Sequence, residues 1–235
     1  MEVLVVGNTA YVDDDFCAKA FPGDHVQVVA AAEARRDESS PHASWKELLQ
    51  HLDQAYEFDR VVYLSNYLTP HTDTVGDVET LRSVFRACAG RRIQLLYVAG
   101  PAGAEGAADA AGRTGKGIIA HAANDLCCHY AAREGVQTKI LRVPFLYTAS
   151  AALEDPFLVP LFDACSTGSV ALQGAQDAAF PLLCAEELAV LVRRIFDSWD
   201  GNFETLDVAD TFHHTAGEVG DALKALFPGL AVAYG

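Results

Sequence analysis

Val3-Leu4-Val5-Val6-Gly7 stands almost at the start of the chain, and this stretch sets the expected fold. Four consecutive apolar residues that end at a glycine are typical of a strand buried on both faces, as in the middle of a parallel sheet. The same signal returns at His25–Ala30, at Arg60–Leu64 and at Ile93–Val98. Short apolar runs at such intervals predict an α/β domain.

Longer amphipathic stretches separate these runs and predict helices. The spacing of Trp45, Leu48 and Leu52 favours a helix, because these side chains would share one face. The helices expected in this part of the chain are Trp45–Tyr56, Asp77–Ala89 and Ile118–Arg133, and a further strand is expected over Thr138–Phe145. Strands that alternate with helices need crossover connections, so we expect a Rossmann-like, doubly wound parallel sheet.

The last third of the chain is less regular. Helices are expected over Pro156–Cys165 and Ala185–Trp199. Thr215 and Glu218 form the pattern of a capping box, which predicts a helix that begins there and runs to Phe227. A final strand is expected after it. With no repeat or linker, the 235 residues are expected to form a single domain.

Charge and cysteine content limit the function classes. The formal net charge is −15, from 32 acidic and 17 basic residues. Such a surface repels nucleic acid and anionic membranes, so neither is expected as a partner. The six cysteines contain no C-x-x-C pair, and no apolar run approaches the roughly 18 residues of a membrane span. Reduced core thiols in a cytoplasmic protein without a targeting segment are therefore expected.

Several segments together resemble one enzyme family. They are Val3–Gly7, Asp59–Leu64, Leu95–Val98, Tyr130–Gly135 with Ile140–Tyr147, and Ala225–Gly229 with Val232–Tyr234. In this order they resemble the extended short-chain dehydrogenase/reductases, the NAD-dependent epimerase/dehydratase family. The resemblance implies a nucleotide-binding core over about residues 1–150. Because the chain is shorter than a typical member, it also implies a reduced C-terminal substrate part over 151–235.

The resemblance implies NAD or NADP as cofactor. The positions that match the family's binding residues are Gly7, Asn8, Thr9, Ala10, Leu64 and Ser65. The family's glycine-rich turn, GxxGxxG, keeps only Gly7 here, since Ala10 and Asp13 stand in the other two places. Carboxylates at a helix start suit the helix dipole but oppose a phosphate, and Asp13–Asp15 is interpreted as N-terminal helix charge. Glu33, Arg35 and Arg36 follow the second strand too late to choose between NAD and NADP.

The catalytic residues implied by the resemblance are missing. Counting back from Tyr130 places Lys116 and Ala120 where the family has the Tyr and Lys of Tyr-x-x-x-Lys. No tyrosine of the chain has a lysine four residues later, and the expected Ser or Thr falls at Gly100 or Pro101. A degenerate member without its catalytic triad is therefore expected.

Three hypotheses follow from this loss. The first is a non-catalytic protein, a pseudoenzyme that senses a nucleotide or binds a protein partner. The second is an NAD(P)-dependent oxidoreductase or epimerase whose proton donor has moved, with Lys116, Tyr63 and His71 as candidates. The third is a structural subunit of a homo- or hetero-oligomer. No metal site is expected, because adjacent histidines such as His213 and His214 point to different sides of the chain.

Overall fold

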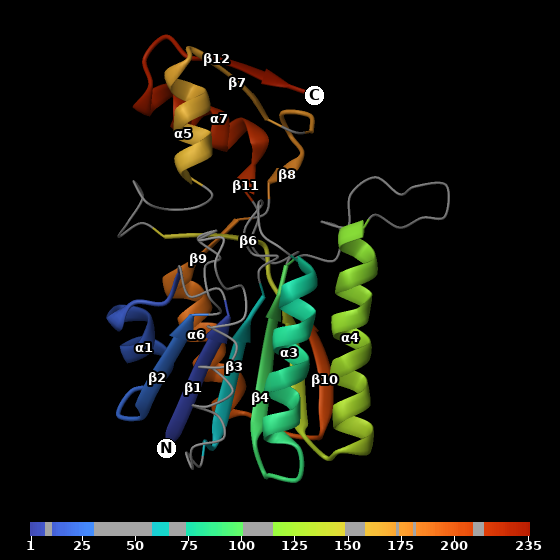
Figure 1. Cartoon of the computed structure of the whole chain (residues 1–235). Helices are drawn as coiled ribbons and strands as arrows, with labels where there is room; N and C mark the ends of the chain where they lie inside the picture. The colour runs from blue at the N-terminus through green and yellow to red at the C-terminus, as the bar shows by residue number, and fades with distance from the viewer. Residues whose placement is uncertain are drawn as a thin grey trace, which may run out of the picture.

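The protein folds into a three-layer α/β body with a small lobe above it (Figure 1). This computed structural model describes residues 1–7, 11–30, 58–65, 74–100, 115–148, 158–172, 174–180, 182–208 and 214–235. The expected helix over 45–56 lies outside the described residues. Within them, no helix is both long enough and apolar enough to cross a bilayer.

The centre of the body is a six-stranded sheet in the order β10-β5-β4-β3-β1-β2. Every neighbouring pair is parallel. The strands are β1 (Glu2–Gly7), β2 (His25–Ala30), β3 (Arg60–Leu64), β4 (Gln94–Ala99), β5 (Gln137–Arg142) and β10 (Phe203–Asp207). The predicted doubly wound parallel sheet is thus confirmed, and the strands expected from the apolar runs are present within one residue at each end.

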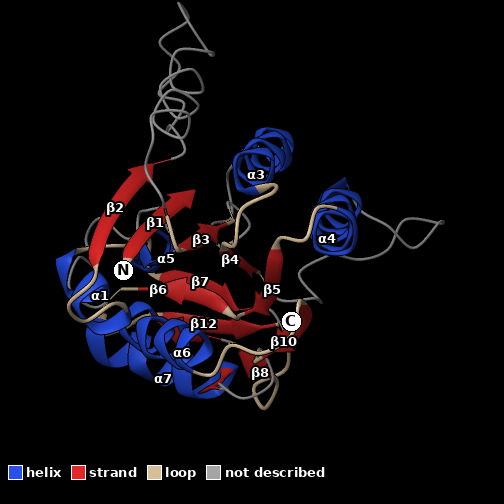
Figure 2. Cartoon of the chain, turned by 90° about the horizontal axis from the view of Figure 1, so that it is seen from below, coloured by secondary structure: helices blue, strands red, loops and turns tan. Residues whose placement is uncertain are grey.

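Helices cover both faces of this sheet (Figure 2). On one face lie α3 (Thr74–Cys88) and α4 (Gly115–Arg133), and on the other lie α1 (Asp14–Ala20) and α6 (Ala185–Asp197). Alternate residues of β1 enter the two cores: Val3 and Val5 pack with α1 and α6, whereas Leu4 and Val6 pack with α3 and α4. This period of two explains why β1 is apolar throughout.

The strand expected over Thr138–Phe145 is in fact two strands. β5 ends at Arg142, and β6 (Phe145–Tyr147) begins after Pro144. Proline has no N–H to give to a ladder, so the chain leaves the main sheet there. β6 instead pairs in parallel with β9 (Leu182–Cys184).

The small lobe has a core of its own. It consists of α5 (Leu158–Ser166), β7 (Ser169–Leu172), β8 (Ala179–Phe180), β11 (His214–Thr215), α7 (Ala216–Leu226) and β12 (Ala231–Tyr234). Its buried centre includes Leu172, Ala216 and Leu223. The predicted capping box is present, because Thr215 Oγ1 accepts from Glu218 N and Glu218 Oε2 accepts from Thr215 N.

The segment after residue 150 contributes to both the body and the lobe. α6 packs on the main sheet and β10 forms its edge, whereas the other helices and most strands of this segment belong to the lobe. The lobe is therefore assembled from two segments, one before β9 and one after β10. Between these two segments the chain returns to the body, where β9 pairs with β6, α6 packs on the main sheet and β10 pairs with β5.

The six cysteines are unpaired. Cys88, Cys127 and Cys165 are buried as expected, whereas Cys128 is exposed. Cys127 and Cys128 are consecutive on α4, so their side chains point about 100° apart around the helix and only one of them faces the core.

Candidate functional site

The candidate site lies at the carboxyl edge of the parallel sheet, between the body and the small lobe (Figure 1). β1 ends there at Gly7, β3 at Leu64 and β4 at Ala99. Open α/β sheets bind their ligands outside the carboxyl ends of the strands. The residues that line this edge therefore decide what the protein can bind.

Gly7 is the last residue of β1 and lies against the backbone of β3. Its φ is 109°, and a Cβ at this position would lie 2.1 Å from the carbonyl oxygen of Leu64. The two residues face each other in the register of β1 and β3. Glycine is therefore required here by the backbone of the neighbouring strand, whether or not a ligand approaches it.

Ser65, expected to contact the cofactor, is held inside the protein. It is fully buried, and its hydroxyl donates to Asp77 Oδ2 over 2.8 Å. Asp77 lies in the first turn of α3 and is 2% exposed. The other carboxylate oxygen, Oδ1, accepts from the Tyr63 hydroxyl over 2.7 Å. This buried network fastens the end of β3 to the start of α3.

The proton-donor candidates are placed in different parts of the fold. Tyr63 is fully buried, and its hydroxyl points to α3. Burial, followed by the charge of Asp77, raises the pKa of the Tyr63 hydroxyl well above its ordinary value. Lys116 lies in the first turn of α4. His71 lies outside the described residues, as do Asn8, Thr9 and Ala10.

The start of α1 is capped by the side chain of Asp13. Asp13 is the N-cap, and its Oδ1 accepts from Phe16 N over 2.7 Å. Asp14 and Asp15 follow in the first turn, which confirms the interpretation of this run as N-terminal helix charge. A phosphate at a helix N-terminus is held by such free amides and by the positive end of the dipole. Here the Asp13 carboxylate already accepts a hydrogen bond from one of these amides, and its negative charge reduces the positive potential at the start of α1.

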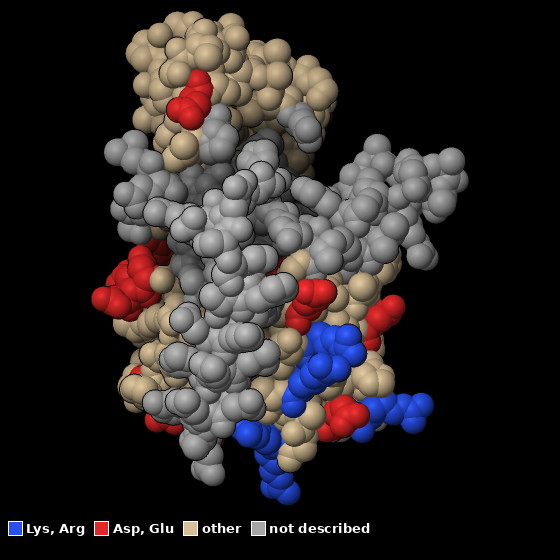
Figure 3. Space-filling view, viewed as in Figure 1, with Lys and Arg blue, Asp and Glu red and all other residues tan. Residues whose placement is uncertain are grey.

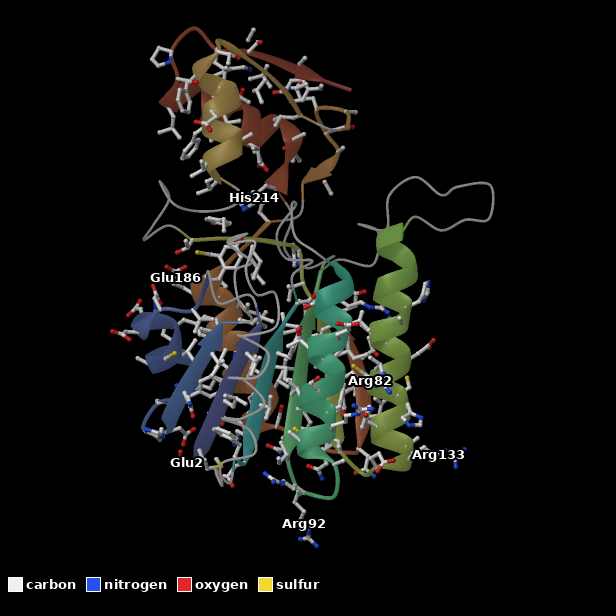
Figure 4. All side chains as sticks on the ribbon, in the orientation of Figure 1. Glu2, Arg82, Arg92, Arg133, Glu186 and His214 are labelled. Atoms are coloured by element: carbon white, nitrogen blue, oxygen red, sulfur yellow. The ribbon has the colours of Figure 1, made fainter. Side chains whose placement is uncertain are left out.

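A second group of carboxylates stands beside the first. Glu186 and Glu187 lie in the first turn of α6, which packs against α1, and Figure 4 labels Glu186 at that end of the helix. The hydrogen bond to Asp15 raises the pKa of the Lys19 ammonium, and Glu186 and Asp13 contribute to the rise. We define the carboxylate end of the site as Asp13, Asp14, Asp15, Glu186 and Glu187.

Tyr147 and Cys184 extend this part of the site and were not among the residues predicted from the sequence. They face each other in the register of β6 and β9. The Cys184 thiol donates to Glu186, and Cys184 N donates to Glu187 Oε2 over 3.3 Å. Burial raises the pKa of Tyr147, and Cys184, Glu187 and Glu186 add to the shift. A phenol in this position keeps its proton and acts as a donor.

Taken together, the described site offers hydrogen-bond donors and negative charge. Its geometry suits a neutral or cationic group and disfavours a phosphate near the start of α1. The signal for Cys184 in the sequence was its position two residues before the pair Glu186 and Glu187, at a helix start. Among the described residues, no group of three or more His, Cys, Asp or Glu is arranged to hold a metal ion.

The capping role of Asp13 gives a first prediction. Asp13→Ala removes the acceptor for Phe16 N, and we expect it to lower the free energy of unfolding by about 1 kcal/mol. Asp13→Asn keeps a capping oxygen and should cost less than half as much. Urea unfolding of the two variants measures the difference. Equal stability of the alanine and asparagine variants would contradict the capping role.

The fold is shared with enzymes that act on nucleotide sugars. No protein-family model matches the chain, and no curated protein matches its sequence. Among solved structures, dTDP-glucose 4,6-dehydratase from Streptomyces venezuelae, with NAD bound, superposes with a TM-score of 0.70 at 12% identity. The match covers 100% of this chain and 84% of that one.

Two epimerases match equally well. UDP-glucuronic acid 4-epimerase from Bacillus cereus, in complex with NAD, has a TM-score of 0.70 at 12% identity, over 100% of this chain and 87% of that one. UDP-glucose 4-epimerase from Thermotoga maritima, with UDP-glucose, has a TM-score of 0.70 at 14% identity, over 100% of this chain and 85% of that one. The chain thus has the Rossmann-like fold of these NAD-dependent enzymes, and at this identity the likeness extends to the fold alone.

Proposed function

We propose that this chain is a non-catalytic protein of the epimerase/dehydratase type, which acts by binding a protein partner. The observation that carries the proposal is the carboxylate end of the site. Asp13 caps α1 where a dinucleotide phosphate would need free amides, and Glu186 and Glu187 add charge of the same sign beside it. Binding a pyrophosphate there would require breaking the cap and overcoming this repulsion.

The sequence supports the same proposal. The Tyr-x-x-x-Lys pair supplies the proton donor and the ribose contact in the family, and its positions are held here by Lys116 and Ala120. Both residues lie on α4, the helix that would carry the pair. The expected Ser or Thr falls at Gly100 or Pro101. A chain that has lost these groups together has no obvious route for hydride and proton transfer.

A nucleotide sensor is the second candidate. It is favoured by the NAD bound in similar structures. NAD or NADP would then bind with its pyrophosphate displaced from α1. If the protein were instead an enzyme with a relocated donor, Tyr147 would be better placed than the buried Tyr63.

A turnover assay tests the proposal. The purified chain is incubated with NAD⁺ and, in turn, UDP-glucose, UDP-glucuronic acid and dTDP-glucose, while NADH absorbance and the sugar products are followed. We expect no product above the protein-free blank, with a UDP-glucose 4-epimerase as the positive control. Turnover of any of these sugars that Tyr147→Phe abolishes would replace the proposal with the enzymatic alternative.

A further inference from the structure

A group of exposed arginines lies at the opposite end of the body from the carboxylate end of the site. Arg82 and Arg86 are on α3, and Arg133 is at the end of α4. Arg91 and Arg92 are in the turn that leads from α3 to β4. We call these five residues the arginine face. Figure 3 shows basic side chains gathered over the lower parts of α3 and α4, and Figure 4 labels Arg82, Arg92 and Arg133 there.

The arginine face differs from the rest of the described surface because its side chains form no ion pairs with carboxylates. Elsewhere, most basic side chains lie within 4.0 Å of a carboxylate; these are Lys19, Arg60, Lys139, Arg142, Arg193 and Lys224. Among the Lys and Arg whose side chains the structure describes, those without such a partner are Arg194 and the five members of the arginine face. In this part of the protein, positive charge that forms no ion pair is therefore concentrated in one place.

Carboxylates are present nearby but do not neutralise the face. Glu79 is one turn before Arg82, Asp125 is on α4, and Glu134 follows Arg133. Among the described side chains, none of the three makes an ion pair with a member of the arginine face. Each guanidinium consequently keeps its donors available for a partner.

The helices that carry the face are firmly held. Phe85 of α3 and Tyr130 of α4 are stacked with their ring centroids 4.7 Å apart. Arg86 follows Phe85 directly, and Arg133 lies three residues after Tyr130. Because this stacked pair fixes α3 against α4, the backbone positions that carry the arginines of both helices are set before any partner binds. A partner therefore need order only the arginine side chains and not the helices.

We propose that the arginine face binds an acidic segment of a partner protein. Guanidinium groups pair with carboxylates in a bidentate manner, and several such pairs fix the position of a partner. The net charge of −15 and the three interspersed carboxylates oppose a polyanion as dense as nucleic acid. A short run of Asp and Glu meets the face without bringing phosphate charge against the rest of the surface. This inference rests on the proposed function, because it names the partner class that the protein would bind.

The test uses the full chain and a fluorescein-labelled peptide of twelve alternating Asp and Glu residues, followed by fluorescence anisotropy at low salt. We expect binding that weakens at least tenfold between about 25 and about 150 mM NaCl, as ion pairs at a surface are screened. Arg82→Ala/Arg86→Ala should weaken binding at least tenfold. The matched control is Arg193→Ala/Arg194→Ala, which removes two exposed helical arginines from α6 and should change the affinity less than twofold.

Three results of the anisotropy assay would overturn the inference. They are equal weakening by the two double variants, absence of binding at low salt, and tighter binding of a fluorescein-labelled oligo(dT) strand than of the peptide. Sedimentation as a dimer that Arg82→Ala/Arg86→Ala dissociates would also overturn it, in favour of a second copy of this chain. Failure of the peptide test leaves the turnover assay unaffected, so the two proposals can fail separately.

Discussion

Gly7→Ala is expected to lower the free energy of unfolding by about 3 kcal/mol, the largest effect expected among the glycines whose surroundings the structure describes. Two costs combine. The backbone at Gly7 has φ of 109°, where a side chain is strained, and the new methyl would lie 2.1 Å from the Leu64 carbonyl oxygen. Because that atom is backbone in the middle of the sheet, it cannot move aside without disturbing the pairing of β1 with β3.

Gly23→Ala is the matched control. Gly23 also has positive φ, 82°, but a Cβ there would meet nothing within 4 Å. It should therefore show the conformational strain alone, about 1 kcal/mol. Urea unfolding followed by circular dichroism measures both variants. If the two variants lost the same stability, the close approach of β3 to Gly7 would not be the cause.

Asp77→Ala is expected to destabilise the fold by about 2 kcal/mol, because it removes the buried carboxylate that accepts hydrogen bonds from both Tyr63 and Ser65. The Tyr63 hydroxyl keeps the main-chain oxygen of Asp77 as an acceptor at 3.0 Å. The loss of the carboxylate therefore weakens the attachment of β3 to α3 and leaves the main-chain contact in place. Thermal and urea unfolding of the single variant give the size of the effect.

A multiple variant separates the network from the packing. In the background Tyr63→Phe/Ser65→Ala the two donors are already absent, so Asp77→Ala should cost at least 1 kcal/mol less than it does alone. An unchanged cost in the two backgrounds would show that Asp77 acts through other contacts, and the network would lose its assigned role.

The central strands could be predicted because burial on both faces makes them apolar throughout. β1, β3 and β4 are strongly apolar, and their positions in the sequence were recognised closely. β10 was missed, since it is an edge strand whose residues Phe203–Asp207 are mostly polar and exposed. Its place is determined by pairing with β5, which no local pattern reveals.

The site was predictable only in part, for a related reason. Asp13 was recognised as a helix-start charge because capping is a local interaction between residues three apart. Asp77 lies twelve residues after Ser65 in the sequence. The hydrogen bond between them depends on how α3 packs on the sheet. The pairing of Tyr147 with Cys184 depends on two short strands that are distant in sequence. Side chains that meet through tertiary packing leave no periodic signal.

The two charged regions make the charge distribution of the protein asymmetric, which the net charge alone does not reveal. Carboxylates gather at the start of α1 and α6, and unpaired arginines gather on α3 and α4. The first region disfavours the phosphates of a dinucleotide, and the second offers a surface for an acidic partner. Both features follow from residue placement, and both are the basis of the proposal that the protein binds a partner.

The most direct test of this account is a thermal-shift titration of the wild-type chain with NAD⁺, NADH, NADP⁺ and NADPH. A dinucleotide with a Kd of about 10 μM, present at about 1 mM, would stabilise the folded state by about 2.7 kcal/mol and raise Tm by several degrees. We predict no rise with any of the four, because the carboxylate end of the site opposes their phosphates. A clear, saturable rise with any one of them would contradict the account and assign the chain to nucleotide sensing or catalysis.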